Sequence, residues 1–564
     1  MAAPYREVRP LHSPPAGRRP HRPARGAPAD RPLPTLRRVT TTLYRRGRLR
    51  SPADPFATAL LVADDQVVWV GGEGAAEALS ADVVVDLEDA WVAPAFVDAH
   101  VHATSTGLAL TGLDLTSAPS LAVALDRVAA AARALRGGAL LGTGWDDTTW
   151  PEGRPPTAAE LDRASYGGVV YLARTDVHSA VVSSALLAAA PEARSAPGFV
   201  GDGLVRQEAH HVVRRAAYAA VRPSQRRAAQ TAALDRAASL GIACVHECGG
   251  PDIGGEDDFS ALLGLEHGVE RIGYWGELGA VDRARELGAV GAGGDLFADG
   301  ALGSHTACLS APYLDEPTSG HAYLSAEQVA RHVAACTHAG LQAGFHAIGD
   351  AALTAVLDGV AAAADEVGLP AVRAARHRVE HAEMLTPDHI AATAAHAVVA
   401  SVQPAFDARW GGDGGMYAGR LGPERARTMN PYAALAAAGV ALALGSDAPV
   451  TPLDPWGTVR AAVAHRTAGS GLSARAAFSA HTRGGWRAAR VEGVGELAPG
   501  APATFAVWAL PGELVVQTPD DRVSAWSTDP RSGVAGLPDL SGPDPNCLRT
   551  VVRGRVVWSV GNAE

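Results

Sequence analysis

Residues 92–102 read Val-Ala-Pro-Ala-Phe-Val-Asp-Ala-His-Val-His, a short apolar run that ends in two histidines separated by one residue. In a β-strand, alternate side chains point to the same face, so His100 and His102 would project together from the end of the strand. Two neighbouring imidazoles are typical ligands of a divalent cation such as zinc. A chain with 20 histidines also produces such a pair by chance, so the interpretation depends on the rest of the sequence.

After this segment, strand-like apolar runs alternate with alanine-rich helical stretches, which is the pattern of a parallel sheet with crossover helices. Eight candidate strands can be counted, the number that a (β/α)8 TIM-like barrel needs. They are predicted at 95–101, 241–247, 271–277, 295–299, 341–346, 377–381, 398–403 and 440–446. The gap from about 105 to 235 is too long for one crossover helix, so it predicts an inserted subdomain.

Both ends of the chain carry further short β-like runs. They lie at 43–48, 57–63, 66–70 and 83–87 before the barrel, and at 503–508, 513–517 and 548–558 after it. We expect the two ends to pair into one small β-sandwich that flanks the barrel. The predicted organisation is therefore a disordered Arg/Pro-rich tail, the N-terminal part of the sandwich, the barrel with its insert, and the C-terminal part of the sandwich, at 1–38, 39–90, 91–490 and 491–564.

The composition restricts the function. Hydrophobic residues make up 47% of the 564 residues, enough for a large core, and the net charge of −11 argues against nucleic acid as a partner. The sequence contains no uninterrupted apolar run long enough for a membrane span. Five scattered cysteines favour a reducing compartment, and hence the cytoplasm. The oligomeric state stays open, with a homodimer as one candidate.

All 49 basic residues are arginines, so the chain has no lysine. This excludes a Schiff-base lysine, a Walker lysine and a carbamylated lysine from the catalytic parts. Barrels place functional groups at the carboxyl ends of their strands. The predicted strands end in residues of metal-ligand type, namely His100 and His102, His246 and Glu247, Asp299, His346, Glu380 and His381, and Asp447. Each alone could be a buried core residue, but together they predict a shared site.

These motifs resemble the amidohydrolase superfamily, and within it the third amidohydrolase family, the YtcJ-like group that includes N-substituted formamide deformylases. The resemblance is carried by VDAHVH at 97–102, FADGALGS at 297–304, HAIGD at 346–350, VEHAE at 379–383, SVQP at 401–404 and GSDAP at 445–449. In the insert it is carried by GWD at 144–146 and RTDVHS at 174–179. It extends from about residue 43 to the C-terminus.

The resemblance implies a metal-dependent hydrolase of a non-peptide carbon–nitrogen bond in an amide, formamide or cyclic amide. The implied metal ligands are His100, His102, His346, His381 and Asp447. A bound cation, with zinc favoured, lowers the pKa of its water towards ~7, and Asp447 would pass the water's proton to the leaving nitrogen. The residues implied to contact the small-molecule substrate are Trp145, Arg174, Asp176 and His178.

One position departs from the family pattern. Family members commonly carry a lysine early in the fourth strand, whose carbamate bridges two metals, and Asp295 stands there in this chain. Aspartate is several bonds shorter, so we expect Asp295 not to reach the bridging point, and one ion is favoured over two. A second ion would then need another acid, such as Glu247 or Asp299. Two alternatives stay open, a non-catalytic barrel that binds a small molecule at a degenerate metal site, and a lactone or phosphotriester hydrolase using the same site.

Overall fold

The computed structural model describes residues 39–135, 137–174, 179–517, 526–527 and 536–561. The predicted tail at 1–38 lies outside these residues, and so do Asp176 and His178. In the part of the chain that is described, no helix combines the length and the apolar character needed to cross a membrane.

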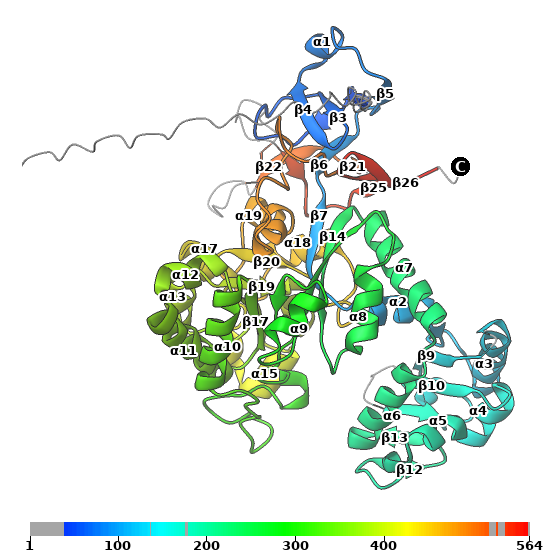
Figure 1. The fold of residues 1–564 in the computed structure, drawn as a ribbon. Coiled ribbons are helices and arrows are strands. Elements are labelled where there is room, and N and C mark those ends of the chain that lie inside the picture. The colour runs from blue at the N-terminus through cyan, green and yellow to red at the C-terminus, as the bar shows by residue number, and fades with distance from the viewer. Residues whose placement is uncertain (1–38, 136, 175–178, 518–525, 528–535, 562–564) are drawn as a thin grey trace, which may run out of the picture. The chain divides into compact units, whose positions relative to one another are not determined.

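The centre of the fold is an eight-stranded parallel sheet that curls into a nearly closed barrel (Figure 1). Its strands follow one another in chain order, as a (β/α)8 barrel requires. They are β7 (Phe96–Val101), β14 (Ile242–Gly249), β15 (Glu270–Trp275), β16 (Gly291–Ala292), β17 (Gln342–Ala347), β18 (Arg378–His381), β19 (Val399–Val402) and β20 (Leu442–Leu444). Beyond the end of β20, the Asp447 amide donates to the His100 carbonyl (2.8 Å) and the His102 amide donates to the Ala448 carbonyl (2.9 Å), which joins the last strand to the first.

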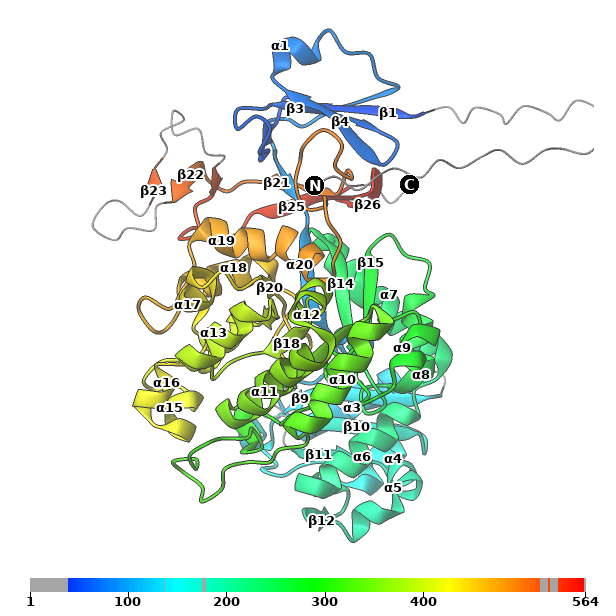
Figure 2. The ribbon, with the colours of Figure 1, turned by 60° about the vertical axis from the view of Figure 1, so that its left-hand side comes forward.

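Helices cover the outside of the barrel (Figure 2), and α10 and α11 pack on β17. Local sequence explains where they begin: Ser325 and Thr386 form capping boxes before α10 and α13, and Pro223 stands in the first turn of α7. The helices of this region are α2 (Ala103–Thr111), α7 (Pro223–Ser239), α8 (Gly255–Leu263), α9 (Val281–Glu286), α10 (Ala326–Ala339), α11 (Asp350–Val367), α12 (Leu369–Ala375), α13 (Pro387–Ala395), α14 (Pro404–Trp410), α15 (Met416–Leu421), α16 (Pro423–Ala426), α17 (Tyr432–Ala437), α18 (Pro455–Val463), α19 (Ala474–Ala480) and α20 (Arg483–Ala488).

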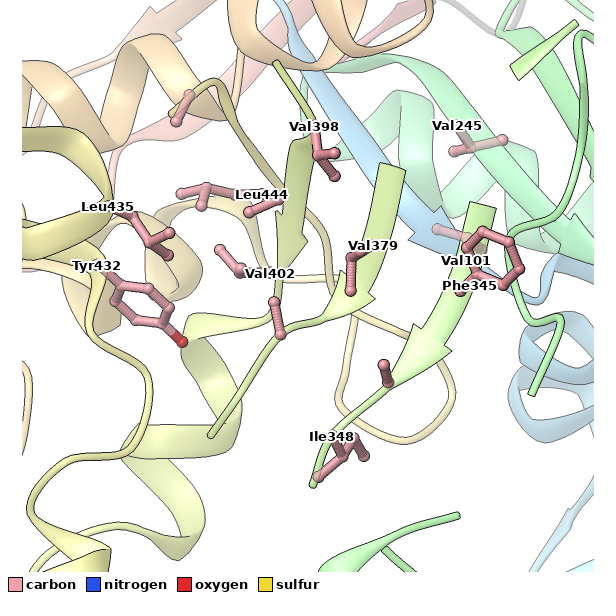
Figure 3. Packing of buried hydrophobic residues seen from close by; sticks show 14 of the residues in the cluster. Val101, Val245, Phe345, Ile348, Val379, Val398, Val402, Tyr432, Leu435 and Leu444 are labelled. Carbon is pink, nitrogen blue, oxygen red and sulfur yellow. The ribbon is translucent and has the colours of Figure 1, made fainter. Parts of the chain in front are cut away.

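Side chains of the barrel strands alternate between two environments. Phe345, Val379 and Val402 belong to the main hydrophobic core (Figure 3). Their strand neighbours His346 and Glu380 take the opposite face, as the two-residue period of a strand requires. The core therefore fixes which face of each strand presents its polar residues to the barrel interior.

The fourth strand differs from the prediction. It is expected at 295–299, but β16 consists of Gly291–Ala292, and beyond it only Phe297 forms an isolated bridge, to His346. Gly294 adopts a left-handed φ of 81°, which ends the extended conformation immediately after the strand. Asp295 therefore lies in an interruption of the fourth strand, between β16 and the segment around Phe297 that hydrogen-bonds to His346 of β17.

The insert forms its own α/β unit around a six-stranded sheet with the order β12-β13-β11-β10-β9-β8. Leu140 and Leu172 pack on one face and Leu141 and Tyr171 on the other, so both faces are covered by helices. The elements are β8 (Leu113–Asp114), α3 (Leu121–Leu135), β9 (Ala139–Trp145), α4 (Ala158–Ala164), β10 (Val169–Arg174), β11 (Ser179–Val182), α5 (Ser184–Ala189), β12 (Phe199–Gly201), β13 (Leu204–Arg206) and α6 (Gln207–Ala219).

The two chain ends form a β-sandwich with a shared core that includes Tyr44, Val92 and Phe505. One sheet has the order β4-β3-β1-β5 and the other the order β2-β6-β21-β25-β26, in which β6 pairs with β21 from the opposite end of the chain. The strands are β1 (Thr41–Arg45), β2 (Arg48–Leu49), β3 (Ala59–Ala63), β4 (Gln66–Gly71), β5 (Val83–Asp86), β6 (Trp91–Pro94), β21 (Phe505–Ala509), β25 (Asn546–Val552) and β26 (Arg555–Ser559).

Two C-terminal runs differ from the prediction. The run at 548–558 is a hairpin of β25 and β26, because Arg553 and Gly554 both adopt a positive φ and make a two-residue turn. The run at 513–517 contains β22 (Leu514–Gln517), which pairs with β23 (Trp526–Ser527) and β24 (Leu537–Pro538) in a separate three-stranded sheet.

Candidate metal centre

The four predicted histidine ligands converge at the carboxyl ends of β7, β17 and β18. The ring centroids of His100 and His102 are 5.3 Å apart, those of His100 and His381 5.1 Å, and those of His346 and His381 4.4 Å. All four rings are largely buried. Residues from distant parts of the chain are therefore close enough to share one polar centre.

Two carboxylates lie among these imidazoles. Asp447 Oδ1 is 3.5 Å from His100 Nε2 and 3.1 Å from His102 Nε2. Asp295 Oδ2 faces the same two nitrogens at 3.4 and 3.2 Å. The other oxygen of Asp295, Oδ1, lies 3.6 Å from His346 Nδ1 and 3.7 Å from His381 Nε2.

The position of Asp295 corrects the expectation that its side chain is too short to reach the middle of the site. That expectation assumed a regular fourth strand, in which the side chain alone would have to cover the distance. The strand is instead interrupted at Gly294 and pairs with β17 again at Phe297, so the position of the Asp295 side chain does not follow from a regular strand. A Cβ on Gly276 would lie 2.7 Å from the Asp295 carbonyl oxygen, so a glycine is needed where this segment passes β15.

Several buried atoms of the centre have no hydrogen-bond partner. They are His100 Nε2, Asp295 Oδ1, His346 Nδ1 and Asp447 Oδ1. Buried polar atoms without partners are costly, and here they point towards one another. Imidazole nitrogens and carboxylate oxygens together form a typical ligand set for a divalent transition-metal ion, so the residues present fit such an ion.

The electrostatics of the centre also favour a cation. Burial alone would raise the pKa of Asp295, but His100 and the other surrounding imidazoles outweigh it and hold the pKa well below its usual range. Burial alone would lower the pKa of His102, but Asp295 and Asp447 raise that pKa to about 10. The carboxylates thus stabilise positive charge at this point, and a metal ion would replace the protons that they otherwise hold on the imidazoles.

Outer partners fix the orientation of three imidazoles. His100 Nδ1 donates to Glu380 Oε2 (3.0 Å), His381 Nδ1 donates to Gln403 Oε1 (2.8 Å), and His346 Nε2 donates to the Gly300 carbonyl (3.2 Å). Each ring therefore turns its other nitrogen towards the centre. Such outer hydrogen bonds set the tautomer of ligating histidines and raise their basicity.

Arg378 shares the partner Glu380 with His100. Its guanidinium group is fully buried, and the sequence motifs do not single it out. It pairs with Glu380 and donates to the Ala99 carbonyl (2.8 Å) and to Ser401 Oγ (2.9 Å). Arg378 and Glu380 are two residues apart on one strand, so they share a face, and this spacing was the available signal. The same guanidinium donates to His246 Nδ1 (3.2 Å). His246 is thus a hydrogen-bond acceptor for Arg378. Burial and the positive charge of Arg378 hold the pKa of His246 well below its usual value.

The other two acids considered for a second metal, Glu247 and Asp299, accept hydrogen bonds from backbone amides. Glu247 accepts a hydrogen bond from the Ala103 amide (2.8 Å) at the start of α2. Asp299 accepts from the amides of Cys308 (2.8 Å), Ile348 (3.0 Å) and Gly349 (2.8 Å), which ties two loops together. Asp295 is therefore the acid of this group that lies between the imidazoles.

In the insert, Trp145 is 1% exposed and its indole donates to the Leu172 carbonyl (2.8 Å), so it packs in the core of that unit. Arg174 pairs with Asp146 (2.8 Å) and Asp147 (3.2 Å) and lies over the Trp145 ring. Contact of these residues with substrate stays a prediction, as it does for Asp176 and His178.

Comparisons with known proteins agree with this architecture. The family model described as "Amidohydrolase family" matches residues 83–558. Protein LONG AFTER FAR-RED 3 of Arabidopsis thaliana is 29% identical over 450 residues, which cover 72% of this chain and 75% of that protein. The protein YtcJ of Bacillus subtilis is 29% identical over 419 residues, which cover 68% of this chain and 75% of YtcJ.

A solved structure is also similar. The crystal structure of an uncharacterized metal-dependent hydrolase from Pyrococcus furiosus superposes with a TM-score of 0.71 at 26% sequence identity. The match covers 83% of this chain and 98% of that one.

Proposed function

The chain belongs to the amidohydrolase family and is a hydrolase, and from this premise we propose that it uses a divalent cation to cleave a non-peptide carbon–nitrogen bond. The proposed substrate is an amide, a formamide or a cyclic amide. The observation that carries the proposal is the convergence of four imidazoles and two carboxylates, in which the facing atoms of His100, His346, Asp295 and Asp447 include ones without a hydrogen-bond partner. Such a set is hard to explain as packing.

We assign the binding of the cation to His100, His102, His346, His381 and Asp447, with zinc as the favoured ion. When bound, a divalent cation supplies a Lewis acid that polarises a carbonyl and makes hydroxide available near neutral pH. The imidazoles must be neutral to bind it, and the hydrogen bonds from His100 to Glu380 and from His381 to Gln403 fix the tautomer in which the facing nitrogen of each ring can act as a ligand.

Asp447 is the proposed proton carrier. Burial alone would raise the pKa of its carboxyl group, but His100 and His102 outweigh burial and lower the pKa, so the group is ionised at neutral pH. It can therefore take a proton from the attacking water and deliver it to the leaving nitrogen. Its backbone amide donates to the His100 carbonyl, so the carboxylate is held beside the imidazoles rather than on a free loop.

The direct test is the metal content and turnover of the purified protein. The wild type should carry at least one equivalent of a divalent metal and hydrolyse members of a panel of formamides, amides and cyclic amides. His100→Ala should lose the metal, whereas Asp447→Asn should lower kcat at least ~10²-fold, the usual effect of removing a general base. His396→Ala, which changes a histidine beyond the end of α13, is the matched control and should keep both metal and turnover.

Lactones and phosphotriesters belong in the same panel, because they test the alternative bond types. Turnover of these esters without turnover of any carbon–nitrogen substrate would contradict the proposed bond. Wild-type protein with well under one equivalent of metal, and no activation by zinc, manganese or iron, would contradict the proposed use of a cation.

A further inference from the structure

We propose that Glu383 is a specificity-determining residue, whose carboxyl group accepts a hydrogen bond from an N–H group of the substrate. This role rests on the proposed function and deepens it, because it restricts the substrate to amides, formamides and cyclic amides whose scissile nitrogen carries a hydrogen. Glu383 takes no part in metal binding or proton transfer in this proposal.

The backbone brings Glu383 to the mouth of the barrel. His381 and Ala382 adopt left-handed φ values of 68° and 49°, so the chain turns sharply where β18 ends. Beyond this turn, the Met384 amide donates to the carbonyl of Ile348 (3.1 Å), the residue that follows β17. The segment that carries Glu383 therefore runs along the carboxyl end of β17, where the metal centre lies.

The side chain of Glu383 is buried, but its hydrogen-bonding capacity is only partly used. It is 3% exposed, and Oε2 accepts a hydrogen bond from the Tyr417 hydroxyl group. Within the described part of the chain, no group donates a hydrogen bond to the other oxygen, Oε1. Asp299, by contrast, accepts hydrogen bonds from three backbone amides. A buried carboxyl group with a single donor can accept further hydrogen bonds, and a substrate can supply one.

Charged groups of the centre lie near this carboxyl group. Burial raises the pKa of Glu383, and the charges of His346 and Asp447 also act on it. His346 belongs to the fifth strand and Asp447 follows the eighth, so they approach Glu383 from separate strands of the barrel. A carboxyl group on which both charges act lies on the inner side of the barrel mouth, where a substrate of this centre has to bind.

A row of aromatic rings joins Tyr417 to the metal centre. Phe406 stacks on His381 with the ring centroids 5.9 Å apart. Trp410 follows at 4.8 Å from Phe406, and Tyr417 at 6.5 Å from Trp410. The partner of Glu383 is therefore part of a largely apolar wall. In apolar surroundings a hydrogen bond is stronger, and an acceptor left without one is costly, so a substrate without an N–H group is disfavoured.

Tyr417 is held in place by its neighbours in α15 and α16. Arg420 donates to the Gly303 carbonyl (3.0 Å), and Arg425 donates to the Pro312 carbonyl (2.8 Å). Both carbonyls belong to the loop after the fourth strand, so two segments far apart in the sequence fix each other. A group that is positioned before the substrate binds loses little freedom on binding, which favours specificity.

The test compares two substrates that differ only in the N–H group, namely the best carbon–nitrogen substrate of the panel and its N-methyl counterpart. N-Butylformamide and N-butyl-N-methylformamide are the formamide pair. The wild type should favour the N–H compound in kcat/KM by at least ~10-fold, since a site built to hydrogen-bond a group rejects the analogue that lacks it. Glu383→Met, which keeps a side chain of similar length, should lose this preference because kcat/KM falls for the N–H compound alone.

Two controls separate this role from a structural one. Glu424→Met makes the same change at an exposed glutamate of α16 and should keep the wild-type preference. The Zn²⁺ content of Glu383→Met should equal that of the wild type. The preference of the wild type itself does not depend on the folding of any variant.

Equal losses of kcat/KM on both compounds, or loss of Zn²⁺ from Glu383→Met, would overturn the specificity role of Glu383. A wild type that cleaves both compounds equally well would also overturn it. These results would leave the proposed function standing, because a carbon–nitrogen bond is still cleaved. Cleavage of no carbon–nitrogen substrate would overturn the proposed function and the role of Glu383 together.

Discussion

Replacing Glu380 by glutamine tests the buried charge pair that supports the metal centre. Glu380 and Arg378 are both fully buried, and Glu380 is also the acceptor for His100. The substitution preserves shape but leaves the guanidinium without its counter-charge. Breaking a buried ion pair by removing one partner costs about 3–5 kcal/mol.

The pKa of Glu380 gives a second way to work out the loss of folding stability in Glu380→Gln. Burial alone would raise this pKa, but Arg378 and His100 outweigh burial and lower it from 4.5 to about 2. At about 1.4 kcal/mol per pH unit, the ionised form is favoured by about 3 kcal/mol in the folded protein. The two routes agree, so we expect Glu380→Gln to lower the free energy of unfolding by about 3 kcal/mol at pH 7.

The assay is urea denaturation of the metal-free protein, with Arg378→Met and the double variant completing the cycle. The double variant should lose less stability than the sum of the two single variants, because it leaves no unpaired buried charge. Glu256→Gln, which breaks the exposed pair with Arg283, is the control and should change stability little. A loss under about 1 kcal/mol in Glu380→Gln, or an additive cycle, would refute the reasoning.

Further predictions concern cation binding, acid stability, the core and one loop. Glu380→Gln should also weaken Zn²⁺ binding about 10–100-fold in a competition titration, because His100 loses its acceptor. Burial lowers the pKa of His481 to about 4, so the free energy of unfolding should fall by about 3 kcal/mol as the pH drops from 6.5 towards 4. Urea midpoints across this pH range should fall less steeply in His481→Gln than in the wild type. Phe96→Ala, which removes a fully buried ring packed on Trp456, should cost about 3–5 kcal/mol in the same assay. Gly349→Ala would place a Cβ 2.0 Å from the Cys308 carbonyl oxygen, so its melting temperature should fall clearly below that of Gly419→Ala in α15, where a Cβ meets open space.

Much of the centre could be predicted because strand periodicity is local information. An apolar run that ends in His-Val-His fixes both the strand and the face that its histidines share, and the same holds for His346 and His381. The alternation of strands with helical stretches and the short β-runs at both chain ends are also visible in patterns a few residues long. These features need no knowledge of distant contacts.

The position of Asp295 could not be predicted in this way. Side-chain length suggested that an aspartate falls short, but the strand is interrupted at Gly294, and the close approach of Gly293 to Gly344 depends on a neighbouring strand. Arg378 was missed for a similar reason, since a buried arginine is recognised by partners such as Ser401 and Ala99, which are far away in sequence. The hairpin at 546–559 was read as one run because Arg553, unlike Gly554, gives little signal of a turn.

The barrel closes where the metal centre lies. The backbone hydrogen bonds of Asp447 and Ala448 to the first strand form the closing seam, and Asp447 itself faces His100 and His102. Joining segments so distant along the chain is among the slowest steps of folding, because a long loop must be ordered first. A growing polypeptide therefore has to be synthesised at least as far as Asp447 before it can gain its complete ligand set, and cation uptake would report that the barrel has closed.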